Sequence, residues 1–422
     1  MEQKIYNEYV EILKEELLPA MGCTEPIAVA YAAAVAVQAL GEKPESVEVN
    51  VSANIIKNVK SVVVPCTGGL RGIGAAVCAW IVAGCPEKEL EILEEITGEQ
   101  KVEMKKMLDT MPMTIRESDK EYIFDIQIKA CAGGHSGYVE IAGFHTNVIC
   151  VKKDDEIIRE KAYEEQGSSC ATDRSLLTVE KIIEFADCVD VADVEEVLQR
   201  QIDYNWAIAE EGMTGNWGAA IGKTLMEAYG NSVHNRAKAM AAAGSDARMN
   251  GCELPVVINS GSGNQGMTTS LPVIVYAKEL NVSKEMMLRA LVVSNLITIH
   301  MKTGIGRLSA YCGAISAGCG AGAGICYLYG GRAYEISHVI VNAVAINSGV
   351  VCDGAKASCA AKIASAVEAG LLGLQMQKNG KQFYGGDGLV EKGVENTIRN
   401  IGELAKKGMR ETDKTIIQIM TR

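Results

Sequence analysis

The chain has 422 residues, 48% of them hydrophobic, and a net charge of −12. This length allows more than one hydrophobic core and predicts two domains. Its acidic surface lacks the basic stripe that attracts phosphate backbones or anionic lipid, so we expect neither nucleic acid nor a membrane as a partner.

The N-terminal sequence MEQKIYNEYVEILKEELL predicts an amphipathic helix with mixed charges. A signal peptide would instead begin with basic residues and continue with an apolar run. We therefore expect a cytoplasmic protein. In that compartment its fourteen cysteines should be thiols or metal ligands, because cellular reductants keep disulfides open.

Helical patterning extends to about Leu40 and is interrupted by the turn Gly-Cys-Thr-Glu-Pro around Cys23. Between Glu45 and Val151 the pattern alternates, and the runs SVEVNVSA, YIFDIQIKA, GYVEIAG and TNVICV predict strands. Helical patterns at 74–82 and 88–108 lie among them.

After about Leu176 the sequence is almost entirely helical in pattern or rich in Gly and Ala. We therefore predict an α+β protein. Its predominantly α-helical domain, residues 1–42 plus 170–422, would carry an inserted smaller α/β domain, residues 43–169. The uncharged stretch 309–331 is long enough to span a bilayer, but its Gly, Ala, Ser and Cys content favours a tightly packed interior helix or loop.

Three cysteines stand in distinctive contexts: Cys352 and Cys359 in the segment CDGAKASC, and Cys312 in RLSAYCGA. Cys352 and Cys359 are seven residues apart, so they could share one face of a helix or converge on one ion across a glycine turn. Free cysteines are also common as small buried hydrophobic residues. The chain has neither the close four-cysteine run of a ferredoxin nor the paired Cys-x-x-Cys motifs of a zinc ribbon.

Five segments, in the expected order along nearly the whole chain, resemble the L-cysteine desulfidase family. They are GCTEP at Cys23, NIIKNVKSVVVPCTGG at Asn54, INSGSGNQG at Ile258, RLSAYCGA at Cys312 and CDGAKASC at Cys352. That family is related to the α-chain domain of the iron-sulfur L-serine dehydratases.

The resemblance implies a 4Fe-4S cluster with three protein ligands, so that one iron lacks a protein thiolate. On this sequence the ligands fall on Cys312, Cys352 and Cys359. Cys319 is the alternative for the first position, because Gly318-Cys319-Gly320 resembles a serine dehydratase motif. We expect Cys326 in the core.

The resemblance further implies non-redox β-elimination of L-cysteine to hydrogen sulfide, pyruvate and ammonia, without pyridoxal phosphate or a nicotinamide. It points to Cys23 as the base that takes the α-hydrogen. The position of Cys23 before a helix N-terminus suggests a lowered pKa for its thiol.

The segment Asn259–Gly266 combines glycines, hydroxyls and carboxamides, a composition suited to the carboxylate and ammonium of a small amino-acid substrate, although a capped tight turn would look the same. Its predicted substrate contacts are Ser262, Asn264 and Gln265. A second family-like segment could line the same pocket through Asn54, Lys57 and Asn58.

Other positions give weaker signals. His135, His145 and His300 could each be a metal ligand, a proton shuttle or a satisfied core residue. Asp353 could be a helix cap or a catalytic acid. The segment GIGAA at Gly72 is not a complete dinucleotide fingerprint, so we do not expect a nicotinamide cofactor.

Three other functions remain open: an iron-sulfur L-serine dehydratase, a pyridoxal phosphate lyase, and a non-catalytic iron-sulfur redox sensor. The Ser-Ser-His motif typical of the serine dehydratases is absent. The pyridoxal phosphate alternative requires a Schiff-base lysine, and no lysine stands in a recognisable context for one. The many small apolar residues make a homo-oligomer plausible.

Overall fold

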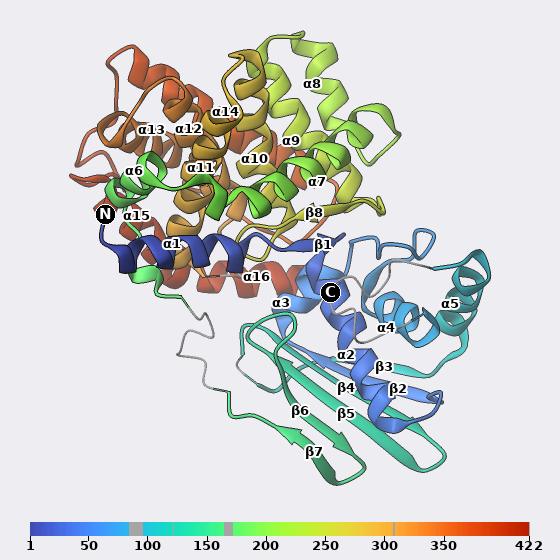
Figure 1. Cartoon of the computed structure of the whole chain (residues 1–422). Coiled ribbons are helices and arrows are strands. Elements are labelled where there is room, and N and C mark those ends of the chain that lie inside the picture. Colours follow the sequence, from blue (N-terminus) through green and yellow to red (C-terminus); the bar gives the residue numbers. More distant parts are fainter. Residues whose placement is uncertain (84–95, 121, 164–171, 307–308, 422) are drawn as a thin grey trace.

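A computed structural model of the chain describes residues 1–83, 96–120, 122–163, 172–306 and 309–421. A larger helical lobe lies against a smaller lobe that contains a sheet (Figure 1). The predicted α+β class is confirmed.

The smaller lobe is built on a six-stranded sheet of order β3-β2-β4-β5-β6-β7, in which β2 and β3 are parallel and every other neighbouring pair is antiparallel. Its elements are α2 (Thr24–Leu40), β2 (Ser46–Val51), α3 (Ala53–Val59), α4 (Gly72–Ala83), α5 (Gly98–Thr110), β3 (Met113–Glu117), β4 (Asp125–Ala132), β5 (His135–Ala142), β6 (Val148–Lys153) and β7 (Glu156–Glu160).

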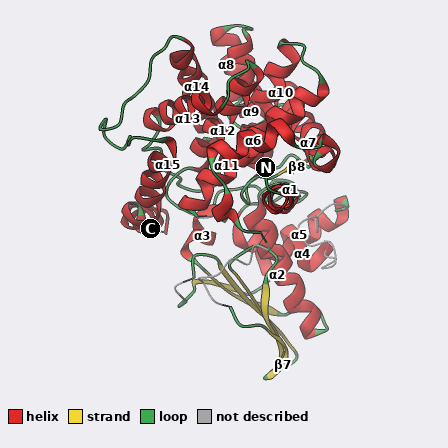
Figure 2. Ribbon diagram, turned by 60° about the vertical axis from the view of Figure 1, so that its left-hand side comes forward, coloured by secondary structure: helices red, strands yellow, loops and turns green. Residues whose placement is uncertain are grey.

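Helix α2 packs directly on this sheet, against β4, β5 and β6. A Cβ atom at Gly137 of β5 would lie 2.1 Å from the backbone oxygen of Ala36, so glycine permits the close approach. Figure 2 shows α2, α4 and α5 on the same side of the sheet.

Ile27 and most other apolar residues of α2 belong to the core of the smaller lobe and not to the helical core. The packing therefore favours a first domain boundary near Gly22 in place of the predicted residue 42, because sequence patterning alone grouped α2 with the other helices. The second predicted boundary, at 169/170, lies outside the described residues. The domain division stays a prediction.

The helical lobe encloses the second large hydrophobic core. Its elements are α1 (Gln3–Glu16), β1 (Pro19–Met21), α6 (Val179–Cys188), α7 (Glu195–Thr214), α8 (Ile221–Tyr229), α9 (Val233–Met249), β8 (Pro255–Val257), α10 (Gly263–Glu279), α11 (Lys284–Ile305), α12 (Gly313–Leu328), α13 (Ala333–Ile346), α14 (Cys359–Lys378), α15 (Val394–Glu403) and α16 (Arg410–Thr421).

Helix α12 is the central helix of this lobe and contacts α10, α11, α13 and α14. A Cβ at Gly318 would lie 2.2 Å from the backbone oxygen of Ala366 in α14, and one at Gly320 would lie 2.2 Å from the hydroxyl of Thr298 in α11. The uncharged stretch thus forms a tightly packed interior helix, as predicted. Among the described residues, no helix combines the length and apolarity needed to cross a membrane.

The two short strands of this lobe bring distant motifs together. Strand β1 pairs antiparallel with β8, with Met21 opposite Pro255. Thr24, shortly after β1, also contacts the segment that follows β8, because its hydroxyl lies 3.2 Å from the backbone oxygen of Gly261. The GCTEP turn is therefore held beside the Asn259–Gly266 segment.

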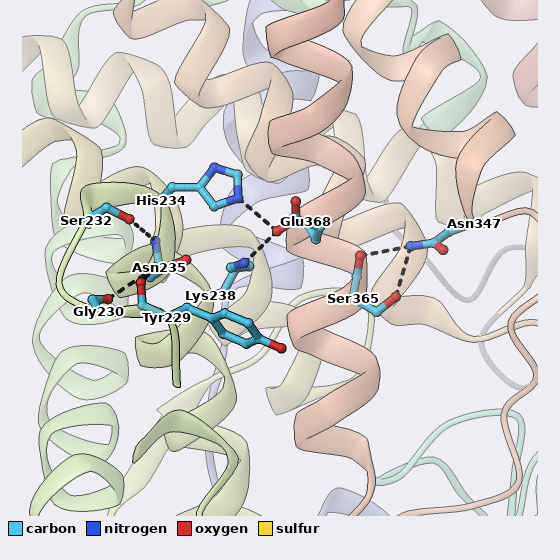
Figure 3. Close-up of polar contacts among 9 residues, drawn as sticks. All are labelled: Tyr229, Gly230, Ser232, His234, Asn235, Lys238, Asn347, Ser365 and Glu368. Carbon is cyan, nitrogen blue, oxygen red and sulfur yellow. Dashed lines mark hydrogen bonds and ion pairs between the residues drawn. The ribbon is translucent and has the colours of Figure 1, made fainter. Parts of the chain in front are cut away.

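A polar clamp joins α9 to α14 (Figure 3). The Glu368 carboxylate of α14 lies 2.8 Å from His234 Nε2 and accepts a hydrogen bond from Lys238 Nζ at 2.6 Å, both on α9. Asn347, at the end of α13, donates to the backbone oxygen of Ser365 at 2.9 Å. The clamp fixes α14, which begins at Cys359, against the helix that carries Arg248 near its end.

The last helix, α16, packs on α3 of the smaller lobe. Lys57 of α3 forms an ion pair with Asp413, and the Lys57 side chain is 1% exposed. Lys60 donates to the backbone oxygen of Met420 near the end of α16. The two lobes are therefore linked by polar contacts.

Candidate active site

A cavity of about 780 Å³, measured to its open mouth, contains side chains from both lobes. Its walls are formed by Cys23, Glu25, Lys57, Asn58, Arg248, Ser262, Asn264, Gln265, Lys302, Ser309, Tyr311, Cys312, Gly313, Ala314, Cys352, Gly354, Ala355, Cys359, Lys362 and Ile363.

This cavity brings together almost every predicted site residue, including the three predicted cluster ligands, Cys23 and the Ser262–Gln265 group. Lys57 and Asn58 also line it. Asn54 does not, although it lies on the same short helix, α3, and its buried side-chain oxygen has no hydrogen-bond partner in the described chain. The roles assigned to these residues stay predictions.

Cys312 and Cys352 flank an isolated β-bridge between Tyr311 and Val351. The Cys312 amide donates to the Val350 oxygen at 3.1 Å, and the Cys352 amide donates to the Ala310 oxygen at 2.6 Å. The bridge holds the two thiols side by side, forty residues apart in sequence. The motif around Cys312 begins with Arg307 and Leu308, which lie outside the described residues.

The thiols of Cys312, Cys352 and Cys359 are close enough to influence one another. Burial first, and then the neighbouring Cys352, raise the pKa of Cys312 to about 12. Burial and then Cys352 also raise the pKa of Cys359, against the opposing effect of the Lys356 backbone amide. Three neighbouring cysteine thiols are a set of side chains that can bind metal as thiolates, with the bound cation taking the place of their protons.

Within the described ranges, no group of three or more His, Cys, Asp or Glu side chains is arranged to hold a single metal ion. Each thiolate of an iron-sulfur cluster binds a different iron, so its sulfurs need not converge on one point. The Ala314 amide near Cys312 and the Lys356 amide near Cys359 supply hydrogen bonds of the kind that cluster ligands accept. The three cysteines therefore fit a cluster.

Cys319, the alternative first ligand, lies two turns into α12. It is 1% exposed, belongs to the helical core and does not line the cavity. Cys326 is also in that core, as expected.

Cys23 is the N-cap residue of α2, and its thiol donates to Glu25 Oε2 at 3.2 Å. Its pKa is raised well above the ordinary value, first by burial and then by the Glu25 carboxylate. The expectation of a lowered pKa is therefore wrong, because desolvation outweighs the helix N-terminus. The resting side chain is a thiol.

Glu25, which the sequence analysis missed, is the acceptor at the centre of this network. Besides Cys23, it accepts a hydrogen bond from Asn58 Nδ2 at 3.1 Å, and the Thr24 hydroxyl, also 3.1 Å away, shares its single proton between Glu25 and the Gly261 oxygen. Burial would raise its pKa, but His145 and the hydrogen bond from Cys23 outweigh burial and lower it. Glu25 is therefore an anion in the cavity wall.

The Asn259–Gly266 segment forms a tight turn that leads into α10. Ser262 is the N-cap of α10, but its side chain makes no capping hydrogen bond. The Gln265 side-chain oxygen is buried at the cavity and has no hydrogen-bond partner in the described chain. A Cβ at Gly313 would lie within 2.6–2.8 Å of that amide group, so this glycine leaves the space that Gln265 occupies beside Cys312.

Two glycines in the motifs allow close contacts that a larger residue would block. Gly22 has φ +63°, and a Cβ there would lie 2.1 Å from Pro65 of the segment VVVPCTGG. Gly354 has φ +91°, and a Cβ there would lie 2.2 Å from the backbone oxygen of Lys57. Each glycine permits two of the motif segments to pack directly against each other.

Three cationic side chains line the cavity besides Lys57: Lys302, and Arg248 and Lys362, which the sequence analysis missed. Lys362 forms an ion pair with Asp353, which also pairs with Lys356. Burial opposes ionisation of Asp353, but these lysines lower its pKa to about 2. Asp353 is therefore an ion-paired carboxylate in the turn before α14 and not a proton donor at neutral pH.

The three histidines lie in different surroundings. His135 contacts Asp154 at 3.1 Å in an exposed turn, and His300 contacts Glu395 at 2.7 Å, and neither lines the cavity. His145 interacts electrostatically with Glu25 and lies 3.7 Å from the position of a Cβ on Gly261. Only His145 therefore lies behind the cavity wall.

Comparison with known proteins identifies relatives over the whole chain. A sequence model of the family described as "Serine dehydratase alpha chain" matches residues 87–418. A UPF0597 protein from Desulfitobacterium hafniense is 59% identical over 99% of this chain and 97% of its own length. UPF0597 proteins from Lachnoclostridium phytofermentans and Treponema denticola are 50% and 43% identical, covering 99% and 100% of this chain and 100% and 99% of their own lengths.

Proposed function

This chain belongs to the serine dehydratase alpha chain family, and from that premise we propose that it is an L-cysteine desulfidase, a lyase that uses a 4Fe-4S cluster. The reaction is non-redox β-elimination of L-cysteine to hydrogen sulfide, pyruvate and ammonia. One observation carries the proposal: the thiols of Cys312, Cys352 and Cys359 line one cavity with Cys23 and the Ser262–Gln265 group.

Cys312, Cys352 and Cys359 would hold the cluster. When bound, a cluster with one iron that lacks a protein thiolate would supply a Lewis acid, which stabilises negative charge on the departing sulfur. The protein's own residues must bind the amino acid, orient it and move its protons.

Cys23 would take the α-hydrogen. Because its pKa is raised, it must first lose its own proton, and the acceptor in place is Glu25, to which the thiol already donates a hydrogen bond. Asn58 and Thr24 hold the carboxylate in position. A buried thiolate with a raised pKa is scarce but strongly basic, which suits removal of a weakly acidic hydrogen.

The protons and electron pairs of the elimination then balance as follows. The Cys23 thiolate takes the proton from Cα, the Cα–H electron pair becomes the double bond, and the Cβ–S bond breaks with its pair on sulfur. The proton held by Glu25 passes to the departing hydrosulfide, so both side chains return to their resting states. The product, aminoacrylate, tautomerises to an imine, which water hydrolyses to pyruvate and ammonia.

Ser262, Asn264 and Gln265 would bind the substrate. The unpartnered side-chain oxygen of Gln265 supports this role, because a buried acceptor without a donor is costly and a substrate ammonium would satisfy it. Lys57 and Asn58 would complete the wall from the smaller lobe.

A second candidate, L-serine dehydration, is favoured by the description of the matching family. The leaving group would then be hydroxide in place of hydrosulfide. We prefer cysteine because GCTEP and CDGAKASC resemble the desulfidases more closely than the dehydratases, and because the sequence lacks the Ser-Ser-His motif.

The test begins with purification without oxygen, followed by measurement of iron and acid-labile sulfide per chain. In the same preparation, release of sulfide and pyruvate from L-cysteine is compared with release of pyruvate from L-serine. About four irons per chain and air-sensitive turnover that prefers L-cysteine are expected. Preference for L-serine would establish the second candidate, and absence of iron after anaerobic reconstitution would overturn the cluster assignment.

A further inference from the structure

Arg248, near the end of α9, is a buried cation whose hydrogen bonds go to uncharged acceptors. It is 2% exposed. Its Nε donates to the Gly22 oxygen at 2.9 Å and its Nη1 donates to Asn264 Oδ1 at 3.1 Å, and both acceptors are uncharged. Among the described residues, no Asp or Glu forms an ion pair with it. Burying a guanidinium in this way is costly unless an anion joins it.

Two other cations of the cavity differ from Arg248, because each forms an ion pair with an aspartate. Lys57 pairs with Asp413 and Lys362 pairs with Asp353. Glu25, an acidic residue of the cavity wall, interacts electrostatically with Arg248, but among the described residues no ion pair or hydrogen bond joins the two side chains. The N–H groups of Arg248 that do not bond Gly22 or Asn264 can therefore bind the anionic group of a ligand.

A second feature at the same point also favours an anion. The position of a Cβ on Gly263, the first residue of α10, lies 2.4 Å from Arg248 Nε. The guanidinium thus lies against the first turn of a 17-residue helix whose N-cap side chain leaves the first amides uncapped. Free amides at a helix N-terminus bind carboxylates and phosphates.

A third feature limits the kind of anion. The buried oxygen of Gln265, two residues further along α10, lines the same cavity without a donor. An acceptor beside a cationic pocket fits a ligand that carries both a carboxylate and an ammonium. An inorganic anion would leave the Gln265 oxygen unsatisfied.

Resting on the proposed function, we infer that Arg248 and the first turn of α10 bind the α-carboxylate of the substrate. Arg248 therefore restricts the enzyme to amino acids whose carboxylate is free. The hydrogen bonds to Gly22 and Asn264 orient its guanidinium and leave the remaining N–H groups for the ligand.

The test uses binding of L-alanine, which has no β leaving group, and of L-alaninamide, in which a neutral amide replaces the carboxylate. Calorimetry on the anaerobic holoenzyme should show at least about 100-fold weaker binding of the amide, the range expected for loss of a buried charge pair. Arg248→Gln should weaken L-alanine binding by a similar factor and leave L-alaninamide binding nearly unchanged. Arg248→Lys should restore part of the discrimination.

Arg236→Lys is the matched control, because Arg236 lies on the same helix but pairs with Glu279 away from the cavity. It should keep the full discrimination. Thermal unfolding of each variant shows whether it has folded. A purely structural Arg248 would weaken both ligands equally, and that result, or equal binding of the two ligands by the unchanged protein, would overturn the inference.

Failure of the proposed function gives a different pattern. If L-cysteine releases no sulfide but L-alanine still binds 100-fold better than its amide in an Arg248-dependent way, the carboxylate site stands and the reaction assignment fails. If sulfide is released equally from L-cysteine and from cysteamine, which has no carboxylate, the reaction stands and the inference about Arg248 fails.

Discussion

Replacing Gly354 by alanine tests whether the contact between the CDGAKASC turn and α3 positions the active site. Gly354 has φ +91°, and an added Cβ would lie 2.2 Å from the backbone oxygen of Lys57. Because that oxygen belongs to the helix backbone, it cannot rotate away as a side chain would. The turn that carries Cys352 must move instead.

The size of the effect follows from two contributions. An L-residue at positive φ costs about 1–2 kcal/mol of folding free energy. The Cβ must also retreat by about 1.2 Å to reach an ordinary contact of 3.4 Å. A displacement of about 1 Å in catalytic geometry can lower the rate about 100-fold. We expect a modest loss of stability and a loss of activity near two orders of magnitude.

Gly330→Ala separates these contributions. Gly330 follows α12, is exposed, has φ +86°, and an added Cβ would have no heavy atom within 4 Å. This variant should show the backbone strain alone in a urea unfolding curve, with unchanged turnover and iron content. Both variants are assayed anaerobically for sulfide release, iron per chain and unfolding midpoint. If Gly354→Ala loses no more activity than Gly330→Ala, the turn does not position the site through this contact.

Three further predictions concern other parts of the chain. Cys312→Ala should lose most of its iron after anaerobic reconstitution, whereas Cys319→Ala should keep it, because only Cys312 lines the cavity; the reverse result would make Cys319 the first ligand. Burial raises the pKa of Asp246 from 3.8 to about 6, so the folded state binds a proton that the unfolded state releases between these pH values. The stability that this proton contributes is complete below pH 3.8 and is lost as the pH rises through 6. Asp246→Asn should therefore reduce the change in unfolding free energy between pH 4 and 7 by up to about 3 kcal/mol. An unchanged pH dependence of the unfolding free energy, measured by urea titration at each pH, would contradict this. His234 first, and then Lys238, lower the pKa of Glu368 to about 2 against burial, so this carboxylate stabilises the fold above pH 4.5 and loses its effect as the pH falls through 2. Because the pair is partly exposed, Glu368→Gln should cost only about 0.5–1 kcal/mol at pH 7, and the cost should shrink by pH 3 in the same assay.

Most of the cavity could be predicted from the motifs, because each motif is a short segment whose functional residues lie within a few positions of one turn. GCTEP, INSGSGNQG, RLSAYCGA and CDGAKASC all meet at the cavity. Asn54 was predicted together with Lys57 and Asn58, but only Lys57 and Asn58 line the cavity, since a short helix presents only some of its side chains to one wall; a role for Asn54 stays a prediction.

The residues that were missed depend on tertiary contacts. Glu25 lies inside a recognised motif, so its charge beside Cys23 was a usable signal. Arg248 has no local signal, because it lies near the end of an alanine-rich helix and becomes notable only when its charge is found buried and without an ion pair to any described residue. The pKa of Cys23 was misjudged for the same reason. Its burial depends on the segments that pack over the turn, and the local sequence does not show which segments these are.

The ion pair between Lys57 and Asp413 has a consequence for how the protein matures. Lys57 leaves the ribosome early, with its ammonium destined for a buried position, and its partner follows more than three hundred residues later. Until Asp413 has been synthesised, α3 lacks the partner of its buried lysine. Cys359 also leaves the ribosome only late in synthesis. The cavity wall that Lys57 forms can therefore be completed only after almost the whole chain has been synthesised.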